Sequence, residues 1–347
     1  MTNSILEYEI KQQPEVLATI LKEEASAVEE VSDSIAKFRP SFISFVARGT
    51  SDNAARYGQY LFGSLNRLPA GLATPSLFTL YKTPPRMDGG LVVGISQSGQ
   101  SPDVVEVVYE SKRQGALTIA ITNDSQSPLA KAAEFVLQLH TGEERSVAAS
   151  KTYTASLLIL AMISTALSGK ESLRRVLLTI PEQVANIITR SDQILEIANE
   201  YRTYDSCMVI GRGFNYATAF EISLKLKELS RVLADPYSPA DFQHGPVALV
   251  ESGFPVLVIA TQGKVLPELT RFLMDLKRRK INLLLITDKE QLMDLGGKSM
   301  PLVPSIQEWA SPILNVIPGQ LFALRLAIAK GFDPDNPRGL TKITLTR

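Results

Sequence analysis

Short apolar runs alternate along the chain with longer segments in which apolar residues recur every three or four positions. In the first half, the runs predict strands over residues 42–47, 91–95, 117–121 and 135–138. The longer segments have helical spacing and cover residues 52–61, 103–112 and 150–168. Strands that alternate with helices are typical of parallel α/β units, so we expect a mostly parallel sheet flanked by helices.

The second half repeats this plan. Strands are expected over residues 207–210, 256–260 and 282–286, and helices over 216–232, 266–279 and 309–330. Three pairs of strings also correspond: FVARGTSDNA (45–54) with MVIGRGFNYA (208–217), GISQSGQSPDVVEVV (94–108) with IATQGKVLPELTRFL (259–273), and LTIAITND (117–124) with LLLITDKE (283–290). The repeat is too long for a solenoid and indicates an internal duplication.

The duplication divides the chain into five predicted parts. These are N-terminal helices (1–38), a first domain (39–170), a helical linker (171–200), a second domain (201–332) and a tail (333–347) rich in Pro and Gly. Two domains of ordinary size fit a chain of 347 residues.

Composition narrows the class of protein. Lys plus Arg equals Asp plus Glu, at 36 each, and no basic cluster occurs, so neither nucleic acid nor an anionic membrane is an expected partner. The single Cys207 fits a reducing compartment, and the first residues lack the pattern of a signal peptide. The apolar stretch 153–167 is short for a membrane span and predicts a buried helix. We therefore expect a cytoplasmic protein.

The stretch GISQSGQSPD (94–103) has more small polar residues than a turn requires. It follows a predicted strand and precedes a predicted helix, the place where open α/β sheets bind ligands. Helix-start N–H groups favour an anion, and Gly99 permits close approach of the backbone. Phosphate is the natural ligand, whereas a Ser-rich helix cap is the plainer alternative. Neither a Walker loop nor a GxGxxG fingerprint is present. The second copy, IATQGKVLPE, lacks the serines, which predicts one anion site per pair of domains.

Two other polar junctions open helices, at residues 48–51 and 147–151, and helix caps explain them equally well. Glu221, Lys225 and Glu228 lie within helical reach of one another, either as a surface ion-pair pattern or as a tuned carboxylate. His244, in a Gly-Pro loop, is either structural or an acid–base group. No metal-ligand spacing emerges.

Together these strings resemble the sugar isomerase (SIS) domain family. The resemblance rests on ARGTSDNA, GISQSGQSPD, SVAASKTYTASL, GRGFNYATAFEISLKLKELS, DFQHGPVAL and NPRGLTK, and spans nearly the whole chain. The strings are similar to those of the isomerase half of the glutamine–fructose-6-phosphate amidotransferases. This resemblance implies two tandem SIS domains, a phosphosugar substrate, no cofactor and no metal.

The resemblance also implies roles for individual residues. The residues implied to hold the substrate are Thr50, Ser51, Ser96, Gln97, Ser98 and Ser101, with Val147 contacting the sugar through its backbone. Glu228 would move a proton between carbons 1 and 2 of the open-chain sugar, and Lys342 would form an imine with the keto sugar. His244 would open the sugar ring in the neighbouring subunit's site, which implies a homodimer.

Departures from the amidotransferase pattern suggest the activity. Its glutaminase domain has no counterpart in these 347 residues, so we expect an isomerising glucosamine-6-phosphate deaminase that releases fructose 6-phosphate and ammonia without glutamine. Gly339 and Thr341 differ from the Asn and Ala that are usual at these tail positions, so the match of the segment that carries Lys342, and with it the basis for the imine role, is incomplete. The alternatives are a fructosamine-6-phosphate deglycase, another phosphosugar aldose–ketose isomerase and a non-catalytic sugar-phosphate sensor.

Overall fold

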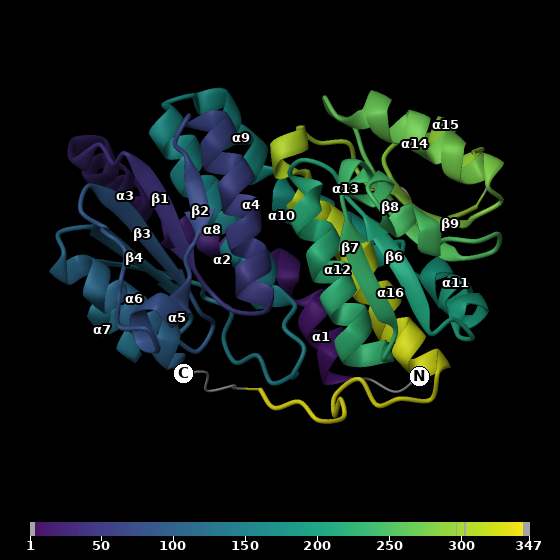
Figure 1. The fold of residues 1–347 in the computed structure, drawn as a ribbon, viewed down its shortest axis with the longest axis horizontal. Coiled ribbons are helices and arrows are strands. Elements are labelled where there is room, and N and C mark those ends of the chain that lie inside the picture. Colours follow the sequence, from purple (N-terminus) through teal and green to yellow (C-terminus); the bar gives the residue numbers. More distant parts are fainter. Residues whose placement is uncertain (1–3, 296, 302, 343–347) are drawn as a thin grey trace. The chain divides into compact units, whose positions relative to one another are not determined.

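The computed structural model describes residues 4–295, 297–301 and 303–342. The chain forms two compact units (Figure 1). The first unit contains Glu15–Glu144, Lys151–Thr179 and the tail from Thr341. The second unit contains the residues up to Pro14, Arg145–Ser150 and Ile180–Leu340.

The first unit is built on a parallel sheet. Its strands are β1 (Phe42–Val46), β2 (Ala70–Leu72), β3 (Gly90–Ile95), β4 (Leu117–Thr122) and β5 (Phe135–Gln138), in the order β2-β1-β3-β4-β5. Its helices are α2 (Gln13–Glu23), α3 (Ala25–Phe38), α4 (Thr50–Leu65), α5 (Pro75–Thr79), α6 (Pro102–Arg113), α7 (Pro128–Ala132), α8 (Lys151–Ser168) and α9 (Glu171–Leu178). All residues of β3 and β4 are buried, as expected for strands covered by helices on both faces.

The second unit has the same topology. Its strands are β6 (Ser206–Ile210), β7 (Leu233–Tyr237), β8 (Pro255–Ala260), β9 (Asn282–Thr287) and β10 (Lys298–Ser299), in the order β7-β6-β8-β9-β10. Its helices are α1 (Ile5–Lys11), α10 (Ile180–Thr189), α11 (Gln193–Tyr201), α12 (Asn215–Ser230), α13 (Pro239–Gln243), α14 (Leu266–Arg278), α15 (Glu290–Met293) and α16 (Ser311–Ala329), with short 3₁₀ helices at Pro246–Leu249 and Glu308–Ala310. Both sheets show the 2-1-3-4-5 strand order, which confirms the internal duplication.

Three strands were not predicted, and all three lie at sheet edges. Strands β2 and β10 are too short to give a periodic signal, and β7 contains Asp235 and Pro236, which are unfavourable in strands. The helix expected over 216–232 was also too long, because α12 ends at Ser230. The next residue, Arg231, takes a left-handed conformation with φ 53°, and the chain then enters β7.

The two most apolar helices are core elements of their units. The windows Lys151–Ser168 and Glu308–Ala329 are long and apolar enough for a membrane span, but 83% of each is buried inside the protein. In the first unit, α3 and α4 pack on α8; in the second, α11 and α12 pack on α16. The buried helix predicted for 150–168 is therefore confirmed.

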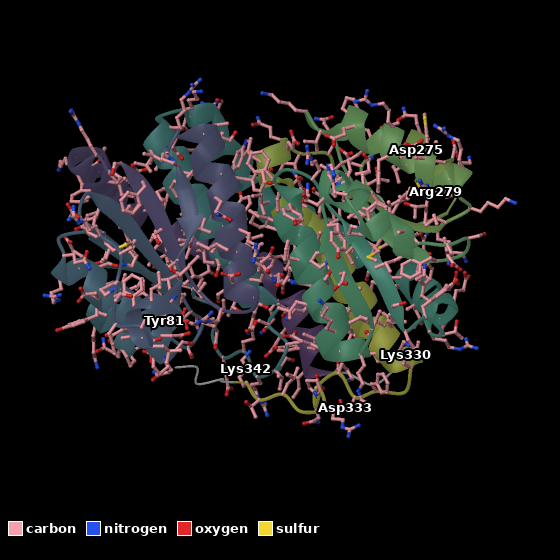
Figure 2. All side chains as sticks on the ribbon, in the orientation of Figure 1. Tyr81, Asp275, Arg279, Lys330, Asp333 and Lys342 are labelled. Carbon is pink, nitrogen blue, oxygen red and sulfur yellow. The ribbon has the colours of Figure 1, made fainter. Side chains whose placement is uncertain are left out.

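The chain leaves α16 as an extended tail. Lys330 caps α16 and pairs with Asp205 at 2.9 Å, and Asp333 follows in the tail (Figure 2). The Asp335 carboxylate then accepts the backbone N–H groups of Ile5 and Leu6, at 2.8 and 3.0 Å. These bonds satisfy free donors at the start of α1 and fix the tail to the second unit.

Candidate active site

The Ser-rich loop lies between the end of β3 and the start of α6, as the sequence predicted. The N–H of Gly99 donates to Ser96 Oγ at 3.1 Å, and the N–H of Gln100 donates to Ser98 Oγ at 3.3 Å. Gly99 has φ 62°, and a Cβ there would lie 2.1 Å from Ser127 Oγ. Only glycine fits this position, so the loop has a fixed and narrow shape.

Three neighbouring strands end at the same edge of this sheet. Val46 of β1 pairs with Gly94 of β3, and Ile95 pairs with Ile121 of β4. Because the strands are parallel, the segments that follow them gather at one edge. The loop residues Ser96, Gln97, Ser98 and Ser101 follow β3, and Thr50 and Ser51 open α4 after β1.

An arginine that the prediction left out lies at this edge. Arg48, directly before Gly49 and α4, contacts Asp103 Oδ2 through Nε at 2.7 Å and through Nη2 at 2.6 Å. The Asp103 side chain is fully buried, whereas 49% of the Arg48 side chain is exposed. The buried carboxylate therefore orients a guanidinium whose other N–H groups can reach an anion. In the sequence, the feature that could have pointed to Arg48 was the Arg-Gly pair at a strand end.

The pKa of a carboxyl group in the first turn of α4, that of Asp52, is also shifted. Burial raises the pKa of the Asp52 carboxyl above its ordinary value, against the opposing effect of Arg56 and Arg48. Arg56 pairs with it at 3.2 Å.

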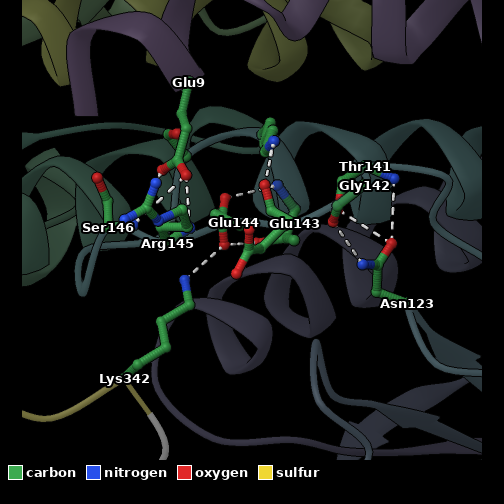
Figure 3. A network of polar contacts seen from close by, with 12 residues as sticks. Glu9, Asn123, Thr141, Gly142, Glu143, Glu144, Arg145, Ser146 and Lys342 are labelled. Carbon is green, nitrogen blue, oxygen red and sulfur yellow. Dashed lines mark hydrogen bonds and ion pairs between the residues drawn. The ribbon is translucent and has the colours of Figure 1, made fainter. Parts of the chain in front are cut away.

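The tail lysine meets a buried carboxylate within the first unit. Lys342 Nζ lies 2.9 Å from Glu144 Oε2, and the Glu144 side chain is fully buried (Figure 3). Nearby, Asn123 binds the segment before Glu144, through its bonds with Thr141 and with the Gly142 carbonyl. Glu144 was not among the predicted site residues, because its contact with Lys342 spans 198 positions.

The predicted proton-transfer residue lies on α12, in the second unit. Lys225 Nζ is 2.5 Å from Glu228 Oε2 and 3.5 Å from Glu221 Oε1. Glu221 and Lys225 are buried, and 21% of the Glu228 side chain is exposed. Of the two carboxylates, Glu228 is the one that reaches the surface, and its ion pair with the buried Lys225 fixes its position.

The two other predicted residues of the second unit lie on loops. His244 caps the C-terminus of α13, and its side chain is exposed. Val147 is half-buried and follows two residues whose N–H groups donate to the Glu9 carboxylate, Arg145 at 2.5 Å and Ser146 at 3.2 Å (Figure 3). The segment that carries Val147 is therefore fixed by a buried carboxylate of α1.

The predicted site residues thus fall on both units. The first unit carries Lys342 and the six loop and helix-start residues, and the second carries Glu228, His244 and Val147. Among residues 4–295, 297–301 and 303–342, no group of three or more His, Cys, Asp or Glu side chains is arranged to hold a metal ion.

Comparison with known proteins decides the family. The model of the SIS domain matches residues 39–166 and again 200–330. The chain belongs to the SIS domain family. Both the predicted family and the predicted fold of two tandem SIS domains are confirmed.

Relatives cover the chain almost completely. The glutamine–fructose-6-phosphate aminotransferase (isomerizing) of Thermococcus kodakarensis is 33% identical over 96% of this chain, which spans 56% of that protein's length. A protein of Silicibacter pomeroyi provisionally named a phosphosugar isomerase is 31% identical, with a TM-score of 0.88 and coverage of 96% of this chain and 100% of the other. The C-terminal domain of the Francisella tularensis glucosamine-fructose-6-phosphate aminotransferase is 25% identical, with a TM-score of 0.81 over 96% and 98%. These relatives support the prediction that the protein is an enzyme.

The second SIS domain fills its own loop with a side chain. The N–H of Lys264 donates to Glu308 Oε2 at 2.7 Å, and the N–H of Gln262 donates to Asp288 Oδ1 at 2.8 Å. Gly263 stands where the first domain has Ser98, and a Cβ there would lie 2.2 Å from Glu308 Cδ. The Glu308 carboxylate therefore occupies the space that a serine side chain at residue 263 would need. The loss of serines noted in the sequence is therefore matched by the gain of an internal anion.

Proposed function

We propose that this SIS protein is an isomerising glucosamine-6-phosphate deaminase. Glucosamine 6-phosphate and water would give fructose 6-phosphate and ammonia. The observation that carries the proposal is that one chain has both a candidate phosphate-binding loop and a candidate acid–base group. The first is the rigid Ser-rich loop at parallel strand ends, and the second is the partly exposed Glu228 carboxylate beside Lys225. The relatives named for isomerising chemistry on fructose 6-phosphate support it.

The first unit would bind the phosphate. The hydroxyls of Ser96, Ser98 and Ser101 and the start of α6 supply small donors where partial positive charge is already present. Arg48 adds a charged donor that Asp103 holds in place. Phosphate binding far from carbons 1 and 2 orients the sugar, which supplies a large part of catalysis in such reactions.

Glu228 would perform the proton transfer. In the open-chain aldehyde, its carboxylate takes the proton from carbon 2, and the electron pair forms the carbon 1–carbon 2 double bond of an enolamine. Return of the proton to carbon 1 leaves an imine at carbon 2, and water hydrolyses that imine to the ketone and ammonia. A single carboxylate suffices because the proton moves between adjacent carbons.

His244 would open the sugar ring in the neighbouring subunit of a homodimer. In support, His244 is exposed, and Leu249 a few residues later is 66% exposed although it is a large apolar side chain. An exposed loop of this kind is accessible to a second copy of the chain. Mixing inactive Glu228→Gln and His244→Ala proteins should then restore about a quarter of wild-type activity, because a mixed dimer has one complete site. No recovery after subunit exchange would contradict the shared site.

The residues present also bear on the source of nitrogen. The single cysteine of the 347 residues, Cys207, is half-buried in β6, and burial raises the pKa of its thiol to about 12. A thiol of this kind is a poor nucleophile at neutral pH. Cys207 is therefore not a candidate for releasing ammonia from glutamine.

One assay tests the activity. Purified protein is incubated with glucosamine 6-phosphate, and fructose 6-phosphate and ammonia are followed together. The proposal expects both products in equal amounts. Folded protein that releases neither would contradict it.

A second candidate is an aldose–ketose isomerase acting on a phosphosugar without nitrogen. It is favoured by the full-length likeness to the Silicibacter pomeroyi protein. The same assay with fructose 6-phosphate alone distinguishes the two. Formation of an aldose phosphate without ammonia, together with inactivity on the amino sugar, would select the second candidate.

A further inference from the structure

Glu144 is a charged side chain held inside the first unit. Its side chain is fully buried, and its carboxylate accepts the N–H of Thr152 at 3.2 Å, the Thr152 hydroxyl at 2.8 Å and the Lys342 ammonium at 2.9 Å (Figure 3). A buried carboxylate is tolerated only where donors and positive charge compensate for lost water. Both are present here.

The position of this carboxylate is fixed by the start of α8. Thr152 lies in the first turn of this 18-residue helix, where partial positive charge favours an anion. Lys151, the residue before it, is buried and donates from Nζ to the Glu143 carbonyl at 2.7 Å. The two acidic neighbours are thus bound to one helix start, Glu144 through its side chain and Glu143 through its backbone.

Lys342, in contrast, comes from a segment outside any helix or strand. The residues from Pro337 to Lys342 form turns and bends, and 24% of the Lys342 side chain is exposed. A four-carbon side chain on such a segment has many conformations in water. The contact with Glu144 selects one of them.

We propose that Glu144 is the positioning residue for Lys342 and fixes the place of its side-chain nitrogen in the resting protein. The role in catalysis rests on the proposed function. When the Lys342 ammonium gives its proton to Glu144, the free amine can attack the carbonyl carbon of a keto sugar. Glu144 then returns the proton to the hydroxyl that leaves as water, so the step consumes an ammonium and a ketone and yields a protonated imine and water.

The test compares three variants. Glu144→Gln keeps the size of the side chain but removes the charge; Glu143→Gln makes the same change at the adjacent exposed residue; Thr152→Val removes one donor to Glu144 without touching Lys342. Two rates are measured at Lys342 by peptide mass spectrometry. One is the rate at which a small amine-reactive reagent acylates Lys342 over a range of pH. The other is the rate at which borohydride traps an imine between Lys342 and fructose 6-phosphate.

The two rates should move in opposite directions in Glu144→Gln. Acylation of Lys342 at neutral pH should rise about three- to tenfold, because the side chain is no longer held against the buried carboxylate and becomes more accessible to the reagent. Trapping should fall by about tenfold or more, because the nitrogen is no longer held and its proton has no acceptor. Glu143→Gln should match wild type in both, and Thr152→Val should lower trapping by a smaller factor. A melting temperature for each variant separates these effects from unfolding.

The outcomes are distinguishable. Acylation within twofold of wild type in folded Glu144→Gln would overturn the proposal, and so would a rise in both rates. If acylation rises as expected but wild-type protein gives no trapped imine, the positioning by Glu144 is supported while the attack of Lys342 on a keto sugar is contradicted; the deaminase activity itself is tested by the ammonia assay.

Discussion

Lys225 Nζ lies 2.5 Å from Glu228 Oε2, and Lys225 is almost completely buried while Glu228 reaches the surface. Because Glu221 and Lys225 are buried, the partly exposed Glu228 carboxylate is the accessible end of the Glu221–Lys225–Glu228 series on α12. An acid–base group needs this combination of a fixed position and access to substrate.

Glu228→Gln should therefore lower kcat by about 10²–10⁴ while leaving phosphosugar affinity nearly unchanged. Turnover of glucosamine 6-phosphate and calorimetric binding of fructose 6-phosphate measure the two quantities. Glu268→Gln, an exposed position on α14, is the control and should behave as wild type. Unchanged turnover in the Glu228 variant would remove this residue from the mechanism.

Gly99→Ala should weaken substrate binding by distorting the Ser-rich loop. The added Cβ meets Ser127 Oγ at 2.1 Å and the residue needs φ 62°, so we expect KM to rise by about tenfold or more, with a loss of about 1–3 kcal/mol in the free energy of unfolding. Gly115→Ala is a matched control, since Gly115 has φ 90° but nothing within 4 Å of a new Cβ. Equal KM values in both variants would show that the clash, and hence the loop shape, is unimportant for binding.

Glu308→Ala should expose a vacant anion loop in the second SIS domain. Loss of the charged acceptor for the Lys264 N–H should cost about 1.5–3 kcal/mol in the free energy of unfolding. Inorganic phosphate should restore part of that stability in the variant more than it stabilises wild type. Denaturant unfolding with and without phosphate measures this; equal phosphate responses in the two proteins would contradict the role of Glu308 as an internal anion.

Glu7 should contribute stability that depends on pH. It forms two hydrogen bonds with Arg325 of α16, at 2.9 and 3.0 Å, and one with Lys11. Burial raises the pKa of the Glu7 carboxyl, but these bonds outweigh burial, so its pKa lies below the ordinary value. A lowered pKa stabilises the folded state above the unfolded value of about 4.3 and ceases to do so as pH falls through the folded value.

Glu7→Gln should accordingly lower the free energy of unfolding by about 1 kcal/mol at neutral pH. The difference from wild type should shrink toward zero as the pH falls below that of ordinary glutamate titration. Glu15→Gln, at an exposed position, is the control and should match the wild-type free energy of unfolding at neutral pH. A constant difference across pH would mean that Glu7 acts through packing alone.

The sequence allowed prediction of what is local and strongly periodic. Strands such as β3 and β4 are buried throughout and appear as continuous apolar runs, and the Ser-rich loop is contiguous. The edge strand β7 was missed because it contains Asp235 and Pro236, which are unfavourable in strands, and it gains its order by pairing with β6. Glu144 and Arg48 were missed for another reason: each acts through a partner far along the chain, Lys342 and Asp103. Spacing within one segment cannot reveal such pairs.

The Glu308 carboxylate, which occupies the loop of the second SIS domain, has a consequence for the stability of the two domains in the cell. Glu308 is tethered to its loop by the chain itself, so its local concentration is constant and independent of any metabolite. The phosphosugar proposed for the first domain, by contrast, would stabilise that domain by an amount that depends on its concentration relative to Kd. Starvation for substrate should therefore loosen one half of the protein and spare the other, and the first domain should be the place where degradation begins.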